Sequence, residues 1–110
     1  HLNSYFYSMI KTIGTHNYFV YILTNRLKSV LYIGVTNNLK NRVYYHSKFV
    51  PNSKHFTHKY NCKYLVYFES YQNINVAINR EKQLKKWSRN KKECLINSTN
   101  SNWNFWNDLI

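Results

Sequence analysis

The sequence predicts an α+β domain in which helices flank a small, mainly antiparallel, three-stranded sheet, in the order ββαβαα. Three short runs rich in aromatic and β-branched residues have the composition of strands, namely Tyr18–Thr24, Val30–Gly34 and Tyr64–Glu69. Two longer stretches repeat apolar residues at helical spacing after polar capping residues. At 110 residues the chain is long enough for one domain with a modest core.

The first two strands are expected to form a hairpin. Tyr18–Thr24 is apolar on both faces, which is typical of a buried strand. The polar segment Asn25–Ser29 has the composition of a turn, and it leads directly into Val30–Gly34.

A helix is expected after the hairpin, capped by Asn37 or Asn38 and continuing to about Lys48. The segment Pro51–Ser53 ends it, and a basic, histidine-rich loop is expected to follow as far as Lys63. The core stripe of this helix is predicted to comprise Leu39 and Val43 and to continue towards Tyr44, Ser47 and Val50.

Two further helices are expected after the third strand. Asn73 or Asn75 opens the first of them, which runs to about Trp87, and a short helix covers roughly Lys91–Ile96. The apolar stripe of the longer helix comprises Ile74, Ala77, Ile78 and Leu84.

The charge balance points to a polyanionic partner. Lysine and arginine number 16 against 4 acidic residues, a net charge of +12. Such an excess is self-repulsive unless a polyanion neutralises it, so nucleic acid is the first candidate partner. An anionic membrane surface is the weaker candidate, because the basic residues are spread along the chain and no apolar run approaches a membrane-spanning length.

Residues 17–110 are expected to form the single domain, and residues 1–16 an N-terminal extension. Met9 is a candidate for an original start, which makes residues 1–8 an upstream or non-native addition. The extension lacks a basic leader followed by a long apolar core, so it does not have the pattern of a secretory signal.

The cysteines and histidines give no complete metal-binding pattern. Cys62 and Cys94 stand far apart, which favours reduced thiols in a cytoplasmic protein. His55 and His58 could form half of a zinc site, but no second pair of ligands exists in the sequence, and a loop facing phosphates is the preferred interpretation.

The acidic residues are so few that they limit the chemistry. The whole inventory is Glu69, Glu81, Glu93 and Asp108. A two-metal nuclease needs several carboxylates, so any metal-dependent hydrolysis here would use one ion. Glu69 is expected to be a capping or surface charge, and Glu93 to pair with a basic residue one helical turn away.

Glu81 is the carboxylate most suggestive of function. It falls on the apolar stripe between Ile78 and Leu84, where a hydrophobic residue is expected. A carboxylate directed inwards is costly without a partner, so it either binds a metal or pairs with a lysine or arginine.

Four residues of the first half form a second group of candidates. Tyr21 and Tyr32 belong to the hairpin, while Arg42 and His46 share one face of the following helix at i, i+4 spacing. Individually, the tyrosines suit a core or a stacking surface, and the other two suit phosphate binding.

Taken together, these residues resemble a known family. The segments that carry the resemblance are Phe19-Val20-Tyr21, Tyr32-Ile33-Gly34, Asn38 to Arg42 with His46, Arg80 to Trp87, and Asn100-x-x-Trp103. This combination resembles the GIY-YIG nuclease domain, and in particular its small stand-alone bacterial branch, which is related to the nuclease domain of a bacterial excision-repair enzyme. Phe19 departs from the pattern by replacing the first motif's glycine, and Val35 stands where some members have a lysine.

The resemblance implies a DNA endonuclease with one Mg²⁺ or Mn²⁺ ion. It assigns the two motif tyrosines to Tyr21 and Tyr32, the invariant arginine to Arg42, the helical His/Tyr position to His46 and the metal-binding glutamate to Glu81. A late asparagine of the family site falls on Asn100, with Asn97 as the competing choice. The alternatives are a non-catalytic nucleic-acid-binding module and an RNA-directed nuclease. The chain contains no base-reading motif, so the preferred DNA structure is not predicted.

Overall fold

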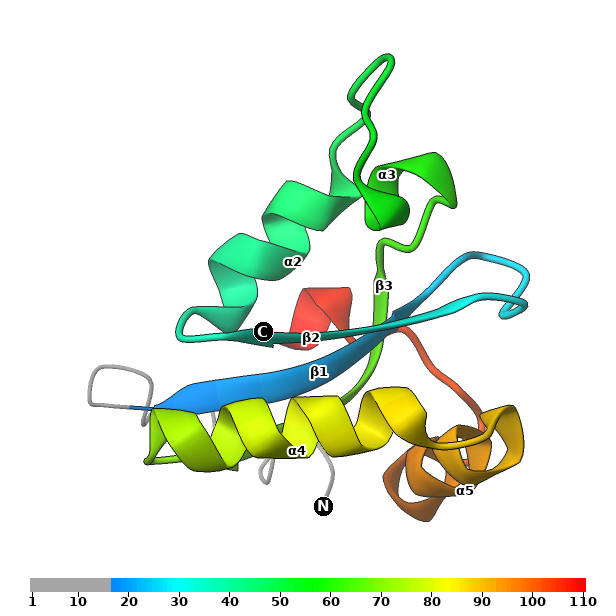
Figure 1. Ribbon diagram of the computed structural model, residues 1–110. Helices are drawn as coiled ribbons and strands as arrows, with labels where there is room; N and C mark the ends of the chain where they lie inside the picture. Colours follow the sequence, from blue (N-terminus) through cyan, green and yellow to red (C-terminus); the bar gives the residue numbers. More distant parts are fainter. Residues whose placement is uncertain (1–16) are drawn as a thin grey trace.

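The computed structural model describes residues 17–110, which form a three-stranded antiparallel sheet flanked by helices (Figure 1). The strands are β1 (Tyr18–Thr24), β2 (Leu31–Thr36) and β3 (Tyr64–Tyr71), and they lie in the order β2-β1-β3. This arrangement confirms the predicted α+β class and the hairpin. The expected N-terminal extension lies outside the described residues.

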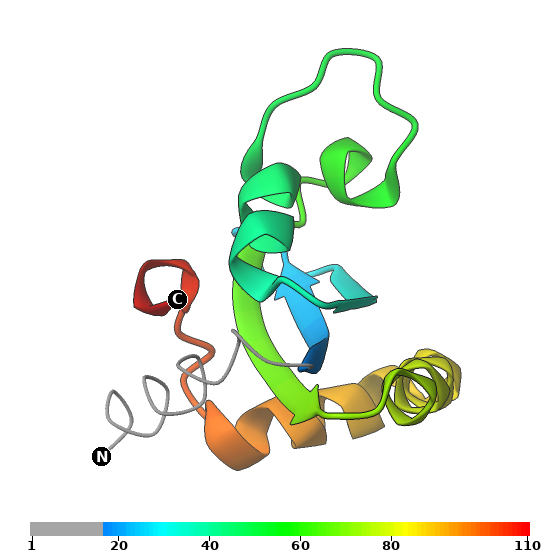
Figure 2. The ribbon, with the colours of Figure 1, turned by 90° about the vertical axis from the view of Figure 1, so that its left-hand side faces the viewer.

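The helices cover both faces of the sheet. They are α2 (Leu39–Ser47), α3 (Phe56–Lys59), α4 (Ile74–Lys86) and α5 (Arg89–Thr99), followed by a short 3₁₀ helix, η2 (Asn107–Leu109). Figures 1 and 2 show α2 and η2 on one face of the sheet, and α4 and α5 on the other. No helix within residues 17–110 is long and apolar enough to cross a membrane.

Alternate residues of the central strand β1 build two separate cores. Phe19, Tyr21 and Leu23 face the α2 side, while Val20 and Ile22 face α4 and α5. The first core also contains Leu39, Val43, Cys62, Leu65, Phe68 and Trp106, and the second contains Ile33, Val66, Tyr67, Ala77, Leu84 and Ile96. Helices cover both faces of β1, and this explains why the strand has apolar residues on both faces.

Several boundaries differ from the predicted ones. The predicted histidine-rich loop contains the single-turn helix α3, because Thr57 turns inwards there and is buried. Strands β2 and β3 extend past their expected ends by pairing with the first residues of β1. The last helix begins at Arg89, before its expected start, because the Ser88 side chain caps it by accepting a hydrogen bond from the Lys91 amide, and it continues past its expected end to Thr99.

The buried stripe of α2 also differs from the predicted one. It runs through Leu39, Val43 and His46, whereas Tyr44 and Val50 are exposed. The prediction followed apolar residues, but hydrogen bonds to neighbouring side chains allow the polar His46 to take the inward position. On α4, likewise, Ile74 lies exposed while Ala77 and Leu84 carry the buried face.

Candidate functional site

Tyr21 crosses from the central strand to the edge strand. The register of β1 and β2 pairs Tyr21 with Gly34, and any Cβ atom at residue 34 would collide with the Tyr21 hydroxyl. The glycine is therefore needed for space, and not for an unusual backbone angle. Because β2 is an edge strand, the phenol lying across it brings its hydroxyl to the margin of the sheet.

The Tyr21 hydroxyl belongs to a short hydrogen-bonded chain of buried groups. It hydrogen-bonds His46 Nε2 at 3.0 Å, and His46 Nδ1 hydrogen-bonds Thr57 Oγ1 at 2.7 Å. Burial, with the nearby charge of Arg42, lowers the pKa of His46 to about 4. The imidazole is thus neutral at neutral pH, so it donates one of these two bonds and accepts the other.

The remaining candidates lie around the same phenol. Burial and the neighbouring hydroxyl of Tyr32 raise the pKa of Tyr21 above its ordinary value. The charge of Arg42 acts in the opposite direction, and that of Glu81 adds to the increase. Both charges act on the same hydroxyl, Arg42 from α2 and Glu81 from α4, and these helices cover opposite faces of the sheet.

An open pocket of about 400 Å³ lies beside this group. Arg42 lines it with an exposed guanidinium, and Tyr32 lines it from β2, with its ring 5.4 Å from that of His46 and 6.2 Å from that of Tyr21. The other lining residues are Asn41, Tyr45, His46 and His55. An anion entering this pocket would meet donors and positive charge.

Glu81 is the carboxylate whose charge acts on the Tyr21 hydroxyl. Its side chain is 15% exposed, and among residues 17–110 its one ion pair is with Lys85, at 3.2 Å, whose own side chain is 52% exposed. No group of three or more histidine, cysteine or acidic side chains within residues 17–110 could enclose a metal ion. A single carboxylate suits Mg²⁺, which keeps several water ligands and binds phosphate oxygens.

The expectation that Glu69 is a capping or surface charge is wrong. Arg80 donates two hydrogen bonds of 2.9 Å to its two carboxylate oxygens, and the hydroxyls of Tyr67 and Tyr71 donate to the same oxygens. Burial alone would raise the pKa of Glu69, but these hydrogen bonds outweigh it and hold the pKa below its usual value. The signal in the sequence was the spacing of Tyr67, Glu69 and Tyr71, since alternate residues of a strand share a face.

Asn100 and Asn97 form their hydrogen bonds with groups other than the candidate residues. Asn100 is buried, and its amide donates to the carbonyls of Val66 and Asn104 and accepts from the Asn104 amide. Asn97 accepts a hydrogen bond from the indole of Trp103. Neither hydrogen-bonds the tyrosines, arginine, histidine or glutamate described above.

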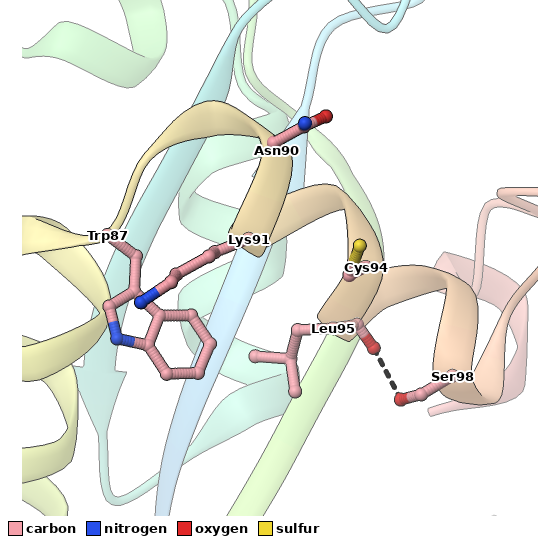
Figure 3. Close-up of a pocket in the computed structure, with 6 residues that line it drawn as sticks. All are labelled: Trp87, Asn90, Lys91, Cys94, Leu95 and Ser98. Atoms are coloured by element: carbon pink, nitrogen blue, oxygen red, sulfur yellow. Dashed lines mark hydrogen bonds between the residues drawn. The ribbon is translucent and has the colours of Figure 1, made fainter.

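A larger hollow of about 560 Å³ lies on α5, next to the end of α4 (Figure 3). It contains none of the candidate residues. Its lining comprises Trp87, Asn90, Lys91, Cys94, Leu95 and Ser98. Its one hydrogen bond between lining residues, from Ser98 to the Leu95 carbonyl, is internal to the helix.

Comparisons with known proteins agree with the motifs. Residues 17–93 match the family described as the GIY-YIG catalytic domain. The chain is 40% identical over 80 residues to UPF0213 protein CPE1444 of Clostridium perfringens, which covers 73% of this chain and 83% of that protein. A solution NMR structure of UPF0213 protein BH0048 from Bacillus halodurans aligns with 79% of this chain and 89% of its own, at 26% identity and a TM-score of 0.49.

Proposed function

The chain belongs to the GIY-YIG family of catalytic domains, a family of nuclease type, and we propose that it is a metal-dependent endonuclease that hydrolyses DNA. The observation that supports this most is the hydrogen bond between the buried Tyr21 hydroxyl and His46, beside an open pocket that Tyr32 and Arg42 line. The proposed reaction group comprises Tyr21, Tyr32, Arg42, His46 and Glu81. The net charge of +12 favours a nucleic acid as the substrate.

Glu81 is the residue proposed to hold one Mg²⁺ or Mn²⁺ ion. Among the described residues its carboxylate pairs only with an exposed lysine, so oxygen atoms are available to a hard cation. When bound, the ion would supply positive charge that stabilises the negative charge of the reacting phosphate. Lys85 would then lose its partner to the ion at little cost, because exposed ion pairs contribute weakly to stability.

Arg42 is proposed to bind the phosphate oxygens. Its side chain is exposed and lines the pocket beside Tyr32, and a guanidinium offers several N–H donors in a planar arrangement that matches phosphate oxygens. Donors aimed at oxygens that gain negative charge stabilise the transition state more than the ground state. The arginine should therefore contribute more to the rate than to binding.

The tyrosines and His46 are proposed to handle the proton of the attacking water. The raised pKa of Tyr21 keeps its hydroxyl protonated, so this phenol orients water, or accepts its proton only while giving its own to His46 Nε2. That transfer requires the tautomer in which Nδ1–H donates to Thr57. Tyr32, which lines the open pocket, is the second group proposed to orient the water.

Asn100 is proposed to have a structural role and no direct part in the reaction. Its three amide hydrogen bonds tie the end of α5 to β3 and to the segment that returns to the sheet. It therefore supports the second core, and we do not include it in the reaction group.

The test is a cleavage panel with labelled single-stranded, duplex, flap and junction DNA and matched RNA, in Mg²⁺, Mn²⁺ or EDTA. Metal-dependent cleavage of DNA is expected. Arg42→Ala should lower the single-turnover rate by orders of magnitude and leave affinity within a few-fold, the signature of an interaction made in the transition state. Tyr32→Phe should keep binding and lose rate, since only a hydroxyl is removed.

Two outcomes would contradict the proposed activity, and a third would contradict the role of Arg42. Binding without cleavage under every condition would favour the non-catalytic module, and cleavage of RNA alone would favour the RNA-directed nuclease. Equal rates for wild type and Arg42→Ala at saturating DNA would make the arginine a phosphate clamp only.

A further inference from the structure

The exposed aromatic side chains are gathered in one part of the molecule. Within residues 17–110, every large aromatic residue that is exposed lies between residues 44 and 60, on α2, on α3 or on the chain around them. These residues are Tyr44, Tyr45, Phe49, Phe56 and Tyr60. In Figures 1 and 2 this part projects beyond the α2 face of the sheet.

Three aromatic rings lead from the candidate site to this surface. Tyr32 lines the pocket, and its ring stacks on that of Phe56 with centroids 6.0 Å apart and planes 27° apart. The ring of Phe56 lies 4.6 Å from that of Tyr60. We call Tyr32, Phe56 and Tyr60 the aromatic ladder. Its inner end is half-buried at the site, and its outer two rings are exposed.

The chain that carries the outer two rings of the ladder has charge of one sign. Glu69 is the first acidic residue of the whole sequence, so the stretch from residue 37 to 68 carries no carboxylate. Its cationic residues are Lys40, Arg42, Lys48, Lys54, Lys59 and Lys63. All three ion pairs among the described residues lie elsewhere, which leaves these cations available to an anionic partner.

We propose that the aromatic ladder binds the unpaired bases of a single-stranded DNA segment that leads to the scissile phosphate. The proposal rests on the proposed nuclease function and narrows its substrate. In a duplex the base faces are stacked on one another, so only unpaired bases can stack on exposed rings. A basic surface that met duplex phosphates alone would gain nothing from exposing Phe56 and Tyr60, whereas basic residues combined with exposed rings suit a single strand.

Binding in EDTA tests the ladder without cleavage. The probes are a labelled 16-nucleotide thymidine strand, an abasic strand of the same length and charge, and a 16-base-pair duplex, compared by fluorescence anisotropy at 150 mM salt. The thymidine strand should bind about tenfold or more tightly than the abasic strand, because each stacked base contributes on that scale. It should also bind more tightly than the duplex.

Tyr60→Leu and Tyr60→Phe form the matched pair of variants. Tyr60 lies at the outer end of the ladder and is exposed, so neither change should alter the melting temperature appreciably. Tyr60→Leu removes the ring and should weaken thymidine-strand binding about tenfold, with abasic-strand binding unchanged. Tyr60→Phe keeps the ring and should bind as wild type does. Leu27→Ala, at an exposed position of the β1–β2 turn, is the control for loss of an apolar side chain.

The proposal is overturned if the abasic strand binds as tightly as the thymidine strand, if the duplex binds as tightly, or if Tyr60→Leu has no effect. Its failure is separable from that of the nuclease. Ladder-dependent binding without cleavage in Mg²⁺ would contradict the proposed nuclease activity and support base binding by the aromatic ladder. Metal-dependent cleavage of duplex and single strand at equal rates, with the Tyr60→Leu variant cleaving and binding as wild type does, would support the nuclease activity and contradict the aromatic ladder.

Discussion

Glu69 and Glu81 are two carboxylates of nearly equal exposure in opposite situations. Their side chains are 14% and 15% exposed. Both oxygens of Glu69 accept hydrogen bonds from Arg80 and from two tyrosine hydroxyls, whereas Glu81 has only the exposed Lys85 as an ion-pair partner within the described part of the chain. Burial alone therefore does not separate these two carboxylates, whereas the number of hydrogen bonds and ion pairs that each makes does.

The tyrosines around the two sites differ in the same way. The hydroxyls of Tyr67 and Tyr71 donate to Glu69; burial, with the hydrogen bond to this carboxylate, raises the pKa of Tyr71 to about 12. The hydroxyl of Tyr21 instead meets the neutral His46, a partner that can both give and take a proton. The tyrosines around Glu69 are suited to hold α4 on the sheet, whereas the pair of Tyr21 and His46 is suited to proton transfer.

Breaking the closed cluster should have the largest effect on stability. Arg80→Met keeps much of the apolar length but leaves the Glu69 carboxylate without its cation, and we expect the free energy of unfolding to fall by about 3 kcal/mol, as for a half-buried pair that loses one partner. Urea denaturation measures it. Glu93→Gln, which removes an exposed partner of Arg89, is the control and should cost under about 1 kcal/mol. Equal losses would mean that the cluster is no more structural than a surface pair.

Acidification should destabilise the fold through His46. Its folded pKa of about 4 lies below the unfolded value of 6.5, so the unfolded chain binds more protons between these values, and stability falls as the pH falls through this window. The full difference is roughly 3 kcal/mol, at about 1.4 kcal/mol per pKa unit. Urea denaturation at pH 7, 5.5 and 4 should show a steeper loss for wild type than for His46→Gln. Parallel curves would contradict a buried, neutral imidazole.

Removing the partner of Glu81 should have the smallest effect. Lys85→Ala breaks an i, i+4 pair whose lysine is half exposed, so the free energy of unfolding should change by less than about 0.5 kcal/mol. Thermal or urea denaturation of Lys85→Ala and Arg80→Met side by side compares the loss in free energy of unfolding for the two variants. A loss above about 1 kcal/mol would make Glu81 a structural ion-pair residue like Glu69.

The strands and most helices could be predicted because local signals agreed with burial. Tyr18–Thr24 is apolar on both faces and is the central strand, and Asn38 and Asn73 accept the capping hydrogen bonds that begin α2 and α4. The α3 turn was not predicted because its stability comes from contacts with distant residues, such as the hydrogen bond between Thr57 and His46.

The candidate site was predictable in part. The family motifs named Tyr21, Arg42 and Glu81, but the sequence could not show that the phenol crosses a glycine to reach the margin of the sheet. It also could not show that Arg80, the neighbour of Glu81 on α4, is committed to Glu69, since that pair joins positions eleven residues apart. Such partners depend on tertiary packing.

The most direct measurement of the central claim is the single-turnover cleavage rate of Glu81→Gln beside Glu93→Gln, with excess protein and Mg²⁺ or Mn²⁺. Both changes replace a carboxylate by an amide of nearly the same shape, and thermal melts should show both variants folded. We predict that Glu93→Gln cleaves at the wild-type rate and that Glu81→Gln loses at least about 100-fold, the scale expected when a group that stabilises transition-state charge is removed. A folded Glu81→Gln protein that cleaves DNA as fast as wild type would contradict the assignment.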